Sequence, residues 1–152
     1  MSEILLNVEN LKKFFPIKKG LLSKTVGYVK AVDDVSFQIK KGETLGLVGE
    51  SGCGKTTIGR ALLRLIEPTG GKVEFEGKDV TAMDQKDLKT LRKDMQIIFQ
   101  DPYSSLNPRM TVGGMITEIL KYHDIAEGEK ADKMVMDLLE RVGLSRLHAR
   151  RY

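Results

Sequence analysis

Residues 49–56, GESGCGKT, combine glycines with a lysine and a threonine at the spacing G-x-x-x-x-G-K-[ST]. Gly49, Gly52 and Gly54 permit backbone dihedrals that are closed to other residues, so successive N–H groups can turn toward phosphate oxygens. We expect Lys55 to reach the β- and γ-phosphates of a nucleotide and the Thr56 hydroxyl to coordinate Mg²⁺. A glycine-rich turn can also be only a tight turn, but its context here, an apolar run before and an amphipathic run after, favours phosphate binding.

The same loop supplies further candidate nucleotide contacts at Ser51, Cys53 and Thr57. We expect Cys53 to contribute a backbone N–H group and Thr57 to donate to the α-phosphate. Cys53 is the only cysteine, so the sequence has no intrachain disulfide and no cysteine spacing for zinc or an iron–sulfur cluster. Its thiol lies at a predicted helix N-terminus, where the thiolate is favoured, and we expect that alkylating it would block nucleotide binding by bulk.

The elements that must hold this loop are a predicted strand at residues 44–48, TLGLV, and a predicted helix from residue 56 to 66. Upstream, residues 4–37 predict strands separated by a basic connector at 14–28. Downstream, we expect a strand at 72–77, a polar helix at 84–93 and a buried strand at 95–99. Amphipathic spacing then predicts helices at 112–122 and 130–142, with Gly143 as a helix stop.

This order predicts an α/β fold of the P-loop NTPase class. Residues 1–48 form its β-rich N-terminal part, an antiparallel β-subdomain, and residues 49–100 form the core with the phosphate loop. Residues 101–152 begin a helical subdomain carried by that core.

The composition is that of an ordinary globular chain, with 41% hydrophobic and 30% charged residues. The longest apolar runs are far shorter than the roughly 20 residues that cross a bilayer, and we recognise no signal peptide. The net charge of +4 suits several anionic partners. We interpret it as a solvated surface rather than a nucleic-acid interface, because aromatic residues do not alternate regularly with the lysines of the densest run, residues 12–30, as they do on a base-stacking platform.

A second motif distinguishes this chain among nucleotide-binding proteins. In residues 95–116, MQIIFQDPYSSLNPRMTVGGMI, a predicted strand ends at Gln100 and a proline-bracketed loop follows. A glutamine there can orient water or complete the coordination of Mg²⁺ at the γ-phosphate, and the following loop can move with that contact. Gln100 can alternatively be a simple strand cap.

Together these residues resemble the nucleotide-binding subunits of ABC transporters, in which a Q-loop joins the core to a helical subdomain. The likeness runs from LNVENLKKFF through VKAVDDVSFQIKKGETLGLVGESGCGKTT to LLERVGL. The stretches FQDPYSSLNPRMTVG and FFPIKKGLLSKTVGYVKAVDDVSF are similar to the oligopeptide, dipeptide and nickel importer branch, and within it to the second of its two paired ATPases.

The resemblance implies further sites. An aromatic residue after the first strand would stack on adenine, which makes Phe15 and Tyr28 candidates, although a core phenylalanine is an equal explanation for Phe15. Gln100 would sense Mg²⁺ and water. The loop at 101–109 would lie near the groove for a coupling helix of the membrane subunit, with Tyr103 and Leu106 as candidate contacts.

The resemblance also implies motifs that this sequence lacks: an SGGQ-type signature, an apolar strand ending in Asp-Glu, and a switch histidine. We therefore expect this chain to be the N-terminal part of a longer subunit that binds ATP with Mg²⁺ but hydrolyses it negligibly on its own. His123 and His148 match no switch position and are expected at the surface.

The implied function is an ATP-binding, energy-coupling subunit of an importer for oligopeptides, dipeptides or a related solute, at the cytoplasmic face of the cell membrane. Its partners would be a second ABC ATPase subunit, transmembrane permease subunits and, indirectly, an extracellular solute-binding protein, with no nucleic acid. The alternatives are a non-transport ABC ATPase acting on nucleic acid or ribosomes, and a small-molecule kinase.

Overall fold

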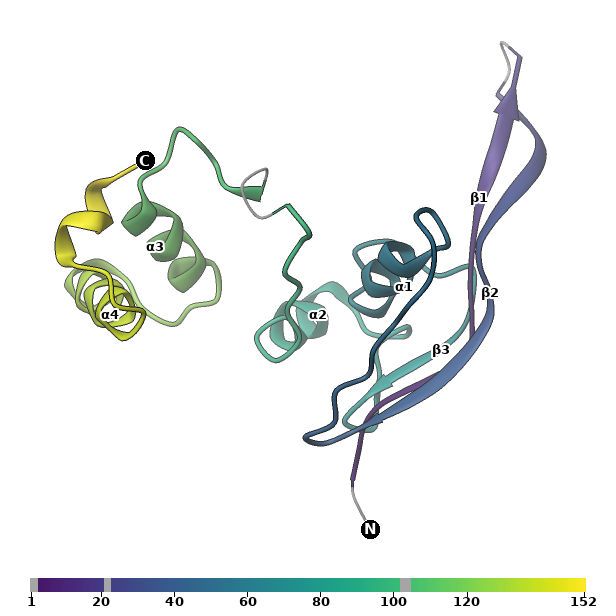
Figure 1. Ribbon diagram of the computed structural model, residues 1–152, viewed down its shortest axis with the longest axis horizontal. Coiled ribbons are helices and arrows are strands. Elements are labelled where there is room, and N and C mark those ends of the chain that lie inside the picture. The colour runs from purple at the N-terminus through teal and green to yellow at the C-terminus, as the bar shows by residue number, and fades with distance from the viewer. Residues whose placement is uncertain (1–2, 21–22, 102–104) are drawn as a thin grey trace. The chain divides into compact units, whose positions relative to one another are not determined.

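The computed structural model describes residues 3–20, 23–101 and 105–152 (Figure 1). The chain divides into two compact units, Met1–Gln96 and Ile97–Tyr152, and each is described by itself.

The first unit contains a four-stranded antiparallel sheet with the order β2-β1-β3-β4. Its strands are β1 (Ile4–Lys19), β2 (Lys24–Lys40), β3 (Gly70–Phe75) and β4 (Lys78–Asp79). Leu6 and Val8 of β1 alternate with polar residues and are buried. Asn10 has φ 48° at a shift in strand register, and Leu11 is buried one residue out of the alternation.

Helices α1 (Lys55–Leu62) and α2 (Gln85–Leu91) complete the first hydrophobic core. Ile58 and Ala61 of α1 and Leu88 and Leu91 of α2 are buried in one cluster with apolar residues of the strands. The predicted helices at 56–66 and 84–93 are therefore present, but both are shorter than expected.

Arg64 ends the α1 region early. It adopts φ 47°, which is left-handed, and its guanidinium donates to the carbonyl oxygens of Val80 at 3.1 Å and Met83 at 2.6 Å. An α-helix cannot continue through a residue with this φ. The last predicted helical turn is therefore absent, and the Arg64 side chain forms hydrogen bonds with the loop after β4 instead.

The prediction of a connector at residues 14–28 was wrong. Apart from Gly20 and Ser23, its described residues belong to β1 and β2, which continue as a two-stranded hairpin to Lys19 and Lys24. Figure 1 shows this hairpin extending beyond the end of β3. The basic residues hid the strand signal, because an exposed hairpin does not need the apolar alternation of a half-buried strand. We call residues 14–19 and 24–30 the arm.

The strands predicted at 44–48 and 95–99 were also wrong. Both stretches lack strand structure, and neither pairs with any of the strands in the described part of the chain. Val48 is 93% exposed and Ile98 is 91% exposed. Apolar content predicts a tendency to be buried, but a strand also needs a hydrogen-bonded neighbour.

The second unit is helical, with α3 (Val112–Tyr122), α4 (Gly128–Arg141) and the short 3₁₀-helix η2 (Arg146–Arg150). The first two confirm the predicted helices. The Thr111 hydroxyl caps α3 by accepting from the Gly114 N–H at 3.1 Å, and Gly143 has φ 76° just beyond α4. Leu120, Val135, Leu139 and Ala149 share a second core. Across the described residues, we find no helix with the length and apolarity that a membrane span requires.

Candidate functional site

The loop at residues 49–54 leads directly into α1, as its sequence predicts. Gly52 and Gly54 have φ values of 84° and 99°, which are left-handed conformations that suit glycine. Gly54 is the N-cap of α1, and no side chain caps this end of the helix. The first N–H groups of α1 therefore lack intrahelical acceptors, and together with the helix dipole they suit an anion.

Strand β2 forms part of the support for this loop. A Cβ atom added at Gly54 would overlap the carbonyl oxygen of Ala31, and one added at Gly49 would lie 2.7 Å from the Cys53 sulfur. The backbone at Gly54 thus approaches β2 too closely for any side chain. The glycines serve packing as well as conformational freedom.

The Lys55 ammonium folds onto the loop itself. Its Nζ donates to the carbonyl oxygens of Gly49 at 2.7 Å and Glu50 at 2.6 Å, and lies 3.4 Å from the Cys53 sulfur. A positive charge is therefore held beside the uncapped N-terminus of α1. Ser51, Cys53 and Thr56 are exposed and Thr57 is half-buried, so the Thr56 hydroxyl is open to a ligand.

The arm has two distinct faces, because directly opposed residues of an antiparallel pair point to the same side. Phe15 opposes Val29, and Ile17 opposes Gly27. Lys13 shares this face, since its Nζ lies 4.9 Å from the Phe15 ring centroid, and it donates to the Glu67 carbonyl just after α1. We call this the loop-side face.

The other side, which we call the outer face, carries the opposed pairs Phe14–Lys30 and Pro16–Tyr28, together with Lys18. Lys30 Nζ lies 5.2 Å from the Phe14 ring centroid. The two candidate adenine contacts are thus on opposite faces: Phe15 on the side of α1 and Tyr28 on the side away from it. Both rings are exposed, by 39% and 62%.

The remaining predicted site residues belong to the second unit or lie outside the described residues. Gln100 and Leu106 are exposed, whereas Tyr103 is not among the described residues. The role of Gln100 at the metal and that of Leu106 at a coupling helix stay predictions.

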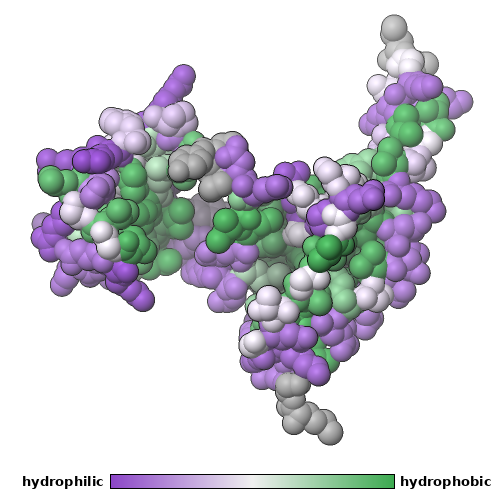
Figure 2. Space-filling view, in the orientation of Figure 1, coloured by the Kyte–Doolittle hydropathy of each residue, from purple (hydrophilic) through white to green (hydrophobic). Residues whose placement is uncertain are grey.

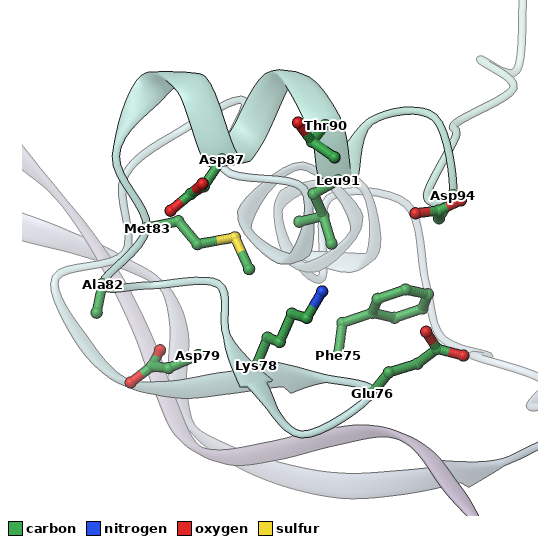
Figure 3. Close-up of a pocket in the computed structure, with 10 residues that line it drawn as sticks. All are labelled: Phe75, Glu76, Lys78, Asp79, Ala82, Met83, Asp87, Thr90, Leu91 and Asp94. Carbon is green, nitrogen blue, oxygen red and sulfur yellow. The ribbon is translucent and has the colours of Figure 1, made fainter.

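A pocket of about 440 Å³ lies elsewhere in the first unit, between the β3–β4 hairpin and α2 (Figure 3). Lys78 points from the hairpin toward α2 among apolar side chains, which include Phe75, Met83 and Leu91. None of the predicted site residues lines this pocket. Phosphate recognition by backbone N–H groups needs no such cavity, so the loop remains the better candidate site.

Among the described residues, no group of three or more His, Cys, Asp or Glu side chains could hold a metal ion. The Asp79 carboxylate accepts hydrogen bonds from the Thr81 hydroxyl and backbone N–H, and these lower the pKa of Asp79. Asp79 is thus a local structural anion.

Ala31 could not be recognised from the sequence as a neighbour of the phosphate loop. Lys13 opposes Val32 and Phe14 opposes Lys30, so Ala31 is the extra residue of a bulge. Nothing in the residue types around Ala31 marks such a bulge. A stronger signal was present at Lys13, whose position just before two phenylalanines suits a cation–π contact.

The sequence and fold of the chain match those of known proteins. A family model described as "ABC transporter" matches residues 32–152. The chain is 48% identical to the oligopeptide transport ATP-binding protein AppF of Bacillus subtilis over 152 residues, covering 99% of this chain and 46% of the relative. It is 51% identical to the glutathione import ATP-binding protein GsiA of Pectobacterium atrosepticum over 151 residues, covering 99% of this chain and 24% of the relative.

Another relative is a probable peptide ABC transporter ATP-binding protein of Sinorhizobium fredii, 48% identical over 100% of this chain and 43% of its own length. The chain therefore spans less than half the length of these curated relatives. Among solved structures, a dimeric ATP-binding cassette bound to ADP and Pi in a post-hydrolysis state matches with a TM-score of 0.76 at 25% identity, covering 97% of this chain and 61% of that one. The predicted fold class is confirmed.

Proposed function

The chain belongs to the ABC transporter family. We therefore propose that it is the ATP-binding part of the energy-coupling subunit of an importer. The observation that carries the proposal is the start of α1. There an uncapped helix N-terminus, two left-handed glycines and the Lys55 ammonium converge on one exposed loop. The relatives, named for oligopeptide transport and glutathione import, favour a peptide-like solute.

In this proposal the loop binds the triphosphate of ATP through the N–H groups of residues 51–57. Lys55 would exchange its contacts with the Gly49 and Glu50 carbonyls for phosphate oxygens, which needs only a rotation of its flexible side chain. Thr57 would donate to the α-phosphate. Bound Mg²⁺ would neutralise phosphate charge, with Thr56 and Gln100 as its protein ligands.

Phe15 is the better of the two candidates for stacking on adenine. Its ring lies on the loop-side face of the arm, together with Lys13, which contacts the segment after α1. Its neighbour Val29 is two residues from Ala31, which touches the phosphate loop, so only about 7 Å of strand separates them. Tyr28 points to the opposite side.

For the whole subunit we propose ATP hydrolysis coupled to import. A second ATPase subunit and membrane-spanning permeases would be its partners, and an extracellular solute-binding protein an indirect one, at the cytoplasmic face of the membrane.

The test is a titration of the chain with a fluorescent ATP analogue, comparing Lys55→Ala with Lys86→Ala, an exposed lysine on α2. Loss of the charge beside the phosphates should weaken binding by at least about tenfold in Lys55→Ala only. Equal affinity in the two variants would contradict the proposed role of the loop. Competition by unlabelled ATP and ADP, but not by adenosine, would show that the phosphates carry the binding.

A further inference from the structure

The arm is exposed on both of its faces. Beyond Lys12 and Gly70, β1 no longer pairs with β3, and the arm continues as β1 and β2 alone. An isolated two-stranded hairpin of this kind is marginally stable in water, because it has no core to pack on. We therefore expect the arm to be covered by another surface.

Charge on the arm has a single sign. From residue 10 to residue 32 the sequence contains six lysines and no acidic residue. At the base of the arm, Lys12 forms an ion pair with Asp34 and Lys30 forms one with Asp33. Further out, Lys18, Lys19 and Lys24 form no ion pair with any other residue that the structure describes. The outer part of the arm therefore carries uncompensated positive charge.

Apolar side chains accompany this charge. Tyr28 is 62% exposed and opposes the exposed Pro16 on the outer face, and Val26 is 56% exposed beside them. Figure 2 shows hydrophobic and hydrophilic residues mixed along the projecting part of the first unit. Tyrosine and lysine side chains are both typical of protein surfaces that lie at the boundary between lipid headgroups and acyl chains.

We propose that the outer face of the arm binds the surface of an anionic lipid bilayer. Tyr28 and Pro16 contact the headgroup boundary and the Lys18 ammonium pairs with lipid phosphates, while Lys19 and Lys24 near the turn add only a general electrostatic attraction. The loop-side face stays turned toward α1 and is left for nucleotide. The inference goes beyond the proposed function and does not depend on it, because lipid contact by the arm requires no ATP.

Nucleic acid is the competing polyanion. Bases stack on open aromatic faces, but the Phe14 ring on the outer face already has Lys30 above it at 5.2 Å. Phe15 lies on the other face, which leaves Tyr28 as the only uncovered ring on the outer face among the described residues. One ring beside an aliphatic residue suits a lipid boundary better than a row of bases.

The two faces supply a matched pair of variants. Tyr28→Ser with Lys18→Gln removes one large side chain and one charge from the outer face. Ile17→Ser with Lys19→Gln removes the same from the loop-side face. All four positions are exposed, so neither variant disturbs a core. Circular dichroism and thermal unfolding are to be used to check that both variants fold.

Cosedimentation of the purified chain with vesicles, without nucleotide, measures the effect. We expect binding to phosphatidylglycerol-rich vesicles, weaker binding to phosphatidylcholine vesicles, and a decrease as salt is raised. Compared with the unchanged chain, the outer-face variant should bind roughly tenfold more weakly. The loop-side variant should bind at most about fivefold more weakly, which is the effect of removing one charge. Equal losses in the two variants, equal binding to neutral vesicles, or binding to a single-stranded RNA but not to vesicles would each overturn the proposal.

Discussion

Gly52 and Gly54 have similar positive φ values, 84° and 99°, but different surroundings. A Cβ at Gly52 would meet nothing within 4 Å, whereas one at Gly54 would overlap the Ala31 carbonyl. Gly52→Ala should therefore lower the free energy of unfolding by about 1 kcal/mol, the cost of a left-handed alanine. Gly54→Ala should lower it by about 3 kcal/mol or more, because β2 and α1 must also separate.

Urea denaturation of both variants measures this difference. Since both glycines belong to the same loop, a general effect of loop rigidity would change the two stabilities equally. An equal loss would mean that the contact between Gly54 and Ala31 is not part of the stable fold.

Cys53 offers a second test at the residue scale. Its sulfur is exposed and lies 3.4 Å from Lys55 Nζ, within the proposed phosphate site. Alkylation with N-ethylmaleimide should weaken ATP binding by at least about tenfold, because the added group occupies the space around Lys55. Unchanged affinity after complete modification, verified by mass spectrometry, would contradict this expectation. Cys53→Ser should bind ATP normally and be insensitive to the reagent.

The candidate phosphate contacts could be predicted because their chemistry depends on residue types at short spacing. Gly54, Lys55 and Thr56 are fixed relative to each other by one loop and the helix that it begins. The contact with Ala31 could not be predicted, since it depends on a bulge in a strand more than 20 residues away. The choice between Phe15 and Tyr28 depends on that same strand register.

At the scale of elements, Arg64 joins the end of α1 to the loop between β4 and α2. Its side chain is only 10% exposed, and it donates to the Val80 and Met83 carbonyls and to the Glu67 carboxylate. Arg64→Met keeps much of the apolar stem but leaves these acceptors without their donor. We expect a loss of about 2–3 kcal/mol in the free energy of unfolding.

Chemical denaturation checks this value, with Arg141→Met at the exposed end of α4 as the control. The control should change stability by about 0.5 kcal/mol at most. Similar losses in both variants would show that the charge, rather than the Arg64 contacts, is responsible.

The hydrogen bonds between Thr81 and Asp79 at the end of β4 should make the stability of the fold depend on pH. The Thr81 hydroxyl, and secondarily its N–H, lower the pKa of Asp79 below its ordinary value of 3.8. A carboxyl whose pKa is lowered in the folded state stabilises that state above 3.8, and the stabilisation is lost as pH falls through the folded pKa. Thr81→Val removes the hydroxyl, so its stability should decline less steeply in this acid range than that of the unchanged chain. Parallel acid profiles in urea would contradict this assignment.

Helices were easier to predict than strands, and the reason is physical. The pattern of α3 and the stop at Gly143 are local properties, and both are present in the structure. A strand depends on its neighbours. Residues 44–48 and 95–99 have strand-like composition but no paired neighbour among the described residues, whereas the basic arm forms strands because its two halves pair with each other.

At the scale of the whole molecule, the described residues form two hydrophobic cores that share no residue. Leu88 is 1% exposed in the first and Leu139 is 3% exposed in the second. Truncating either to alanine should cost about 2–5 kcal/mol within its own unit. Hydrogen exchange should therefore accelerate in β1, β3 and α2 for Leu88→Ala, and in α3 and α4 for Leu139→Ala.

Exchange in the other unit serves as the internal control for each variant. Acceleration throughout the chain in both variants would mean that the two units unfold as one cooperative body, contrary to this expectation.

The uncapped N-terminus of α1 affects how the stability of this chain must be measured. Because no side chain in the described part of the chain caps the first N–H groups of this helix, a bound phosphate would complete their hydrogen bonding. Ligand occupancy and folding of that turn then become one equilibrium, and apparent stability rises with the logarithm of ligand concentration above the Kd. Under the proposed function, the melting temperature of this chain would therefore rise with the ATP concentration of the solution as well as depend on the sequence.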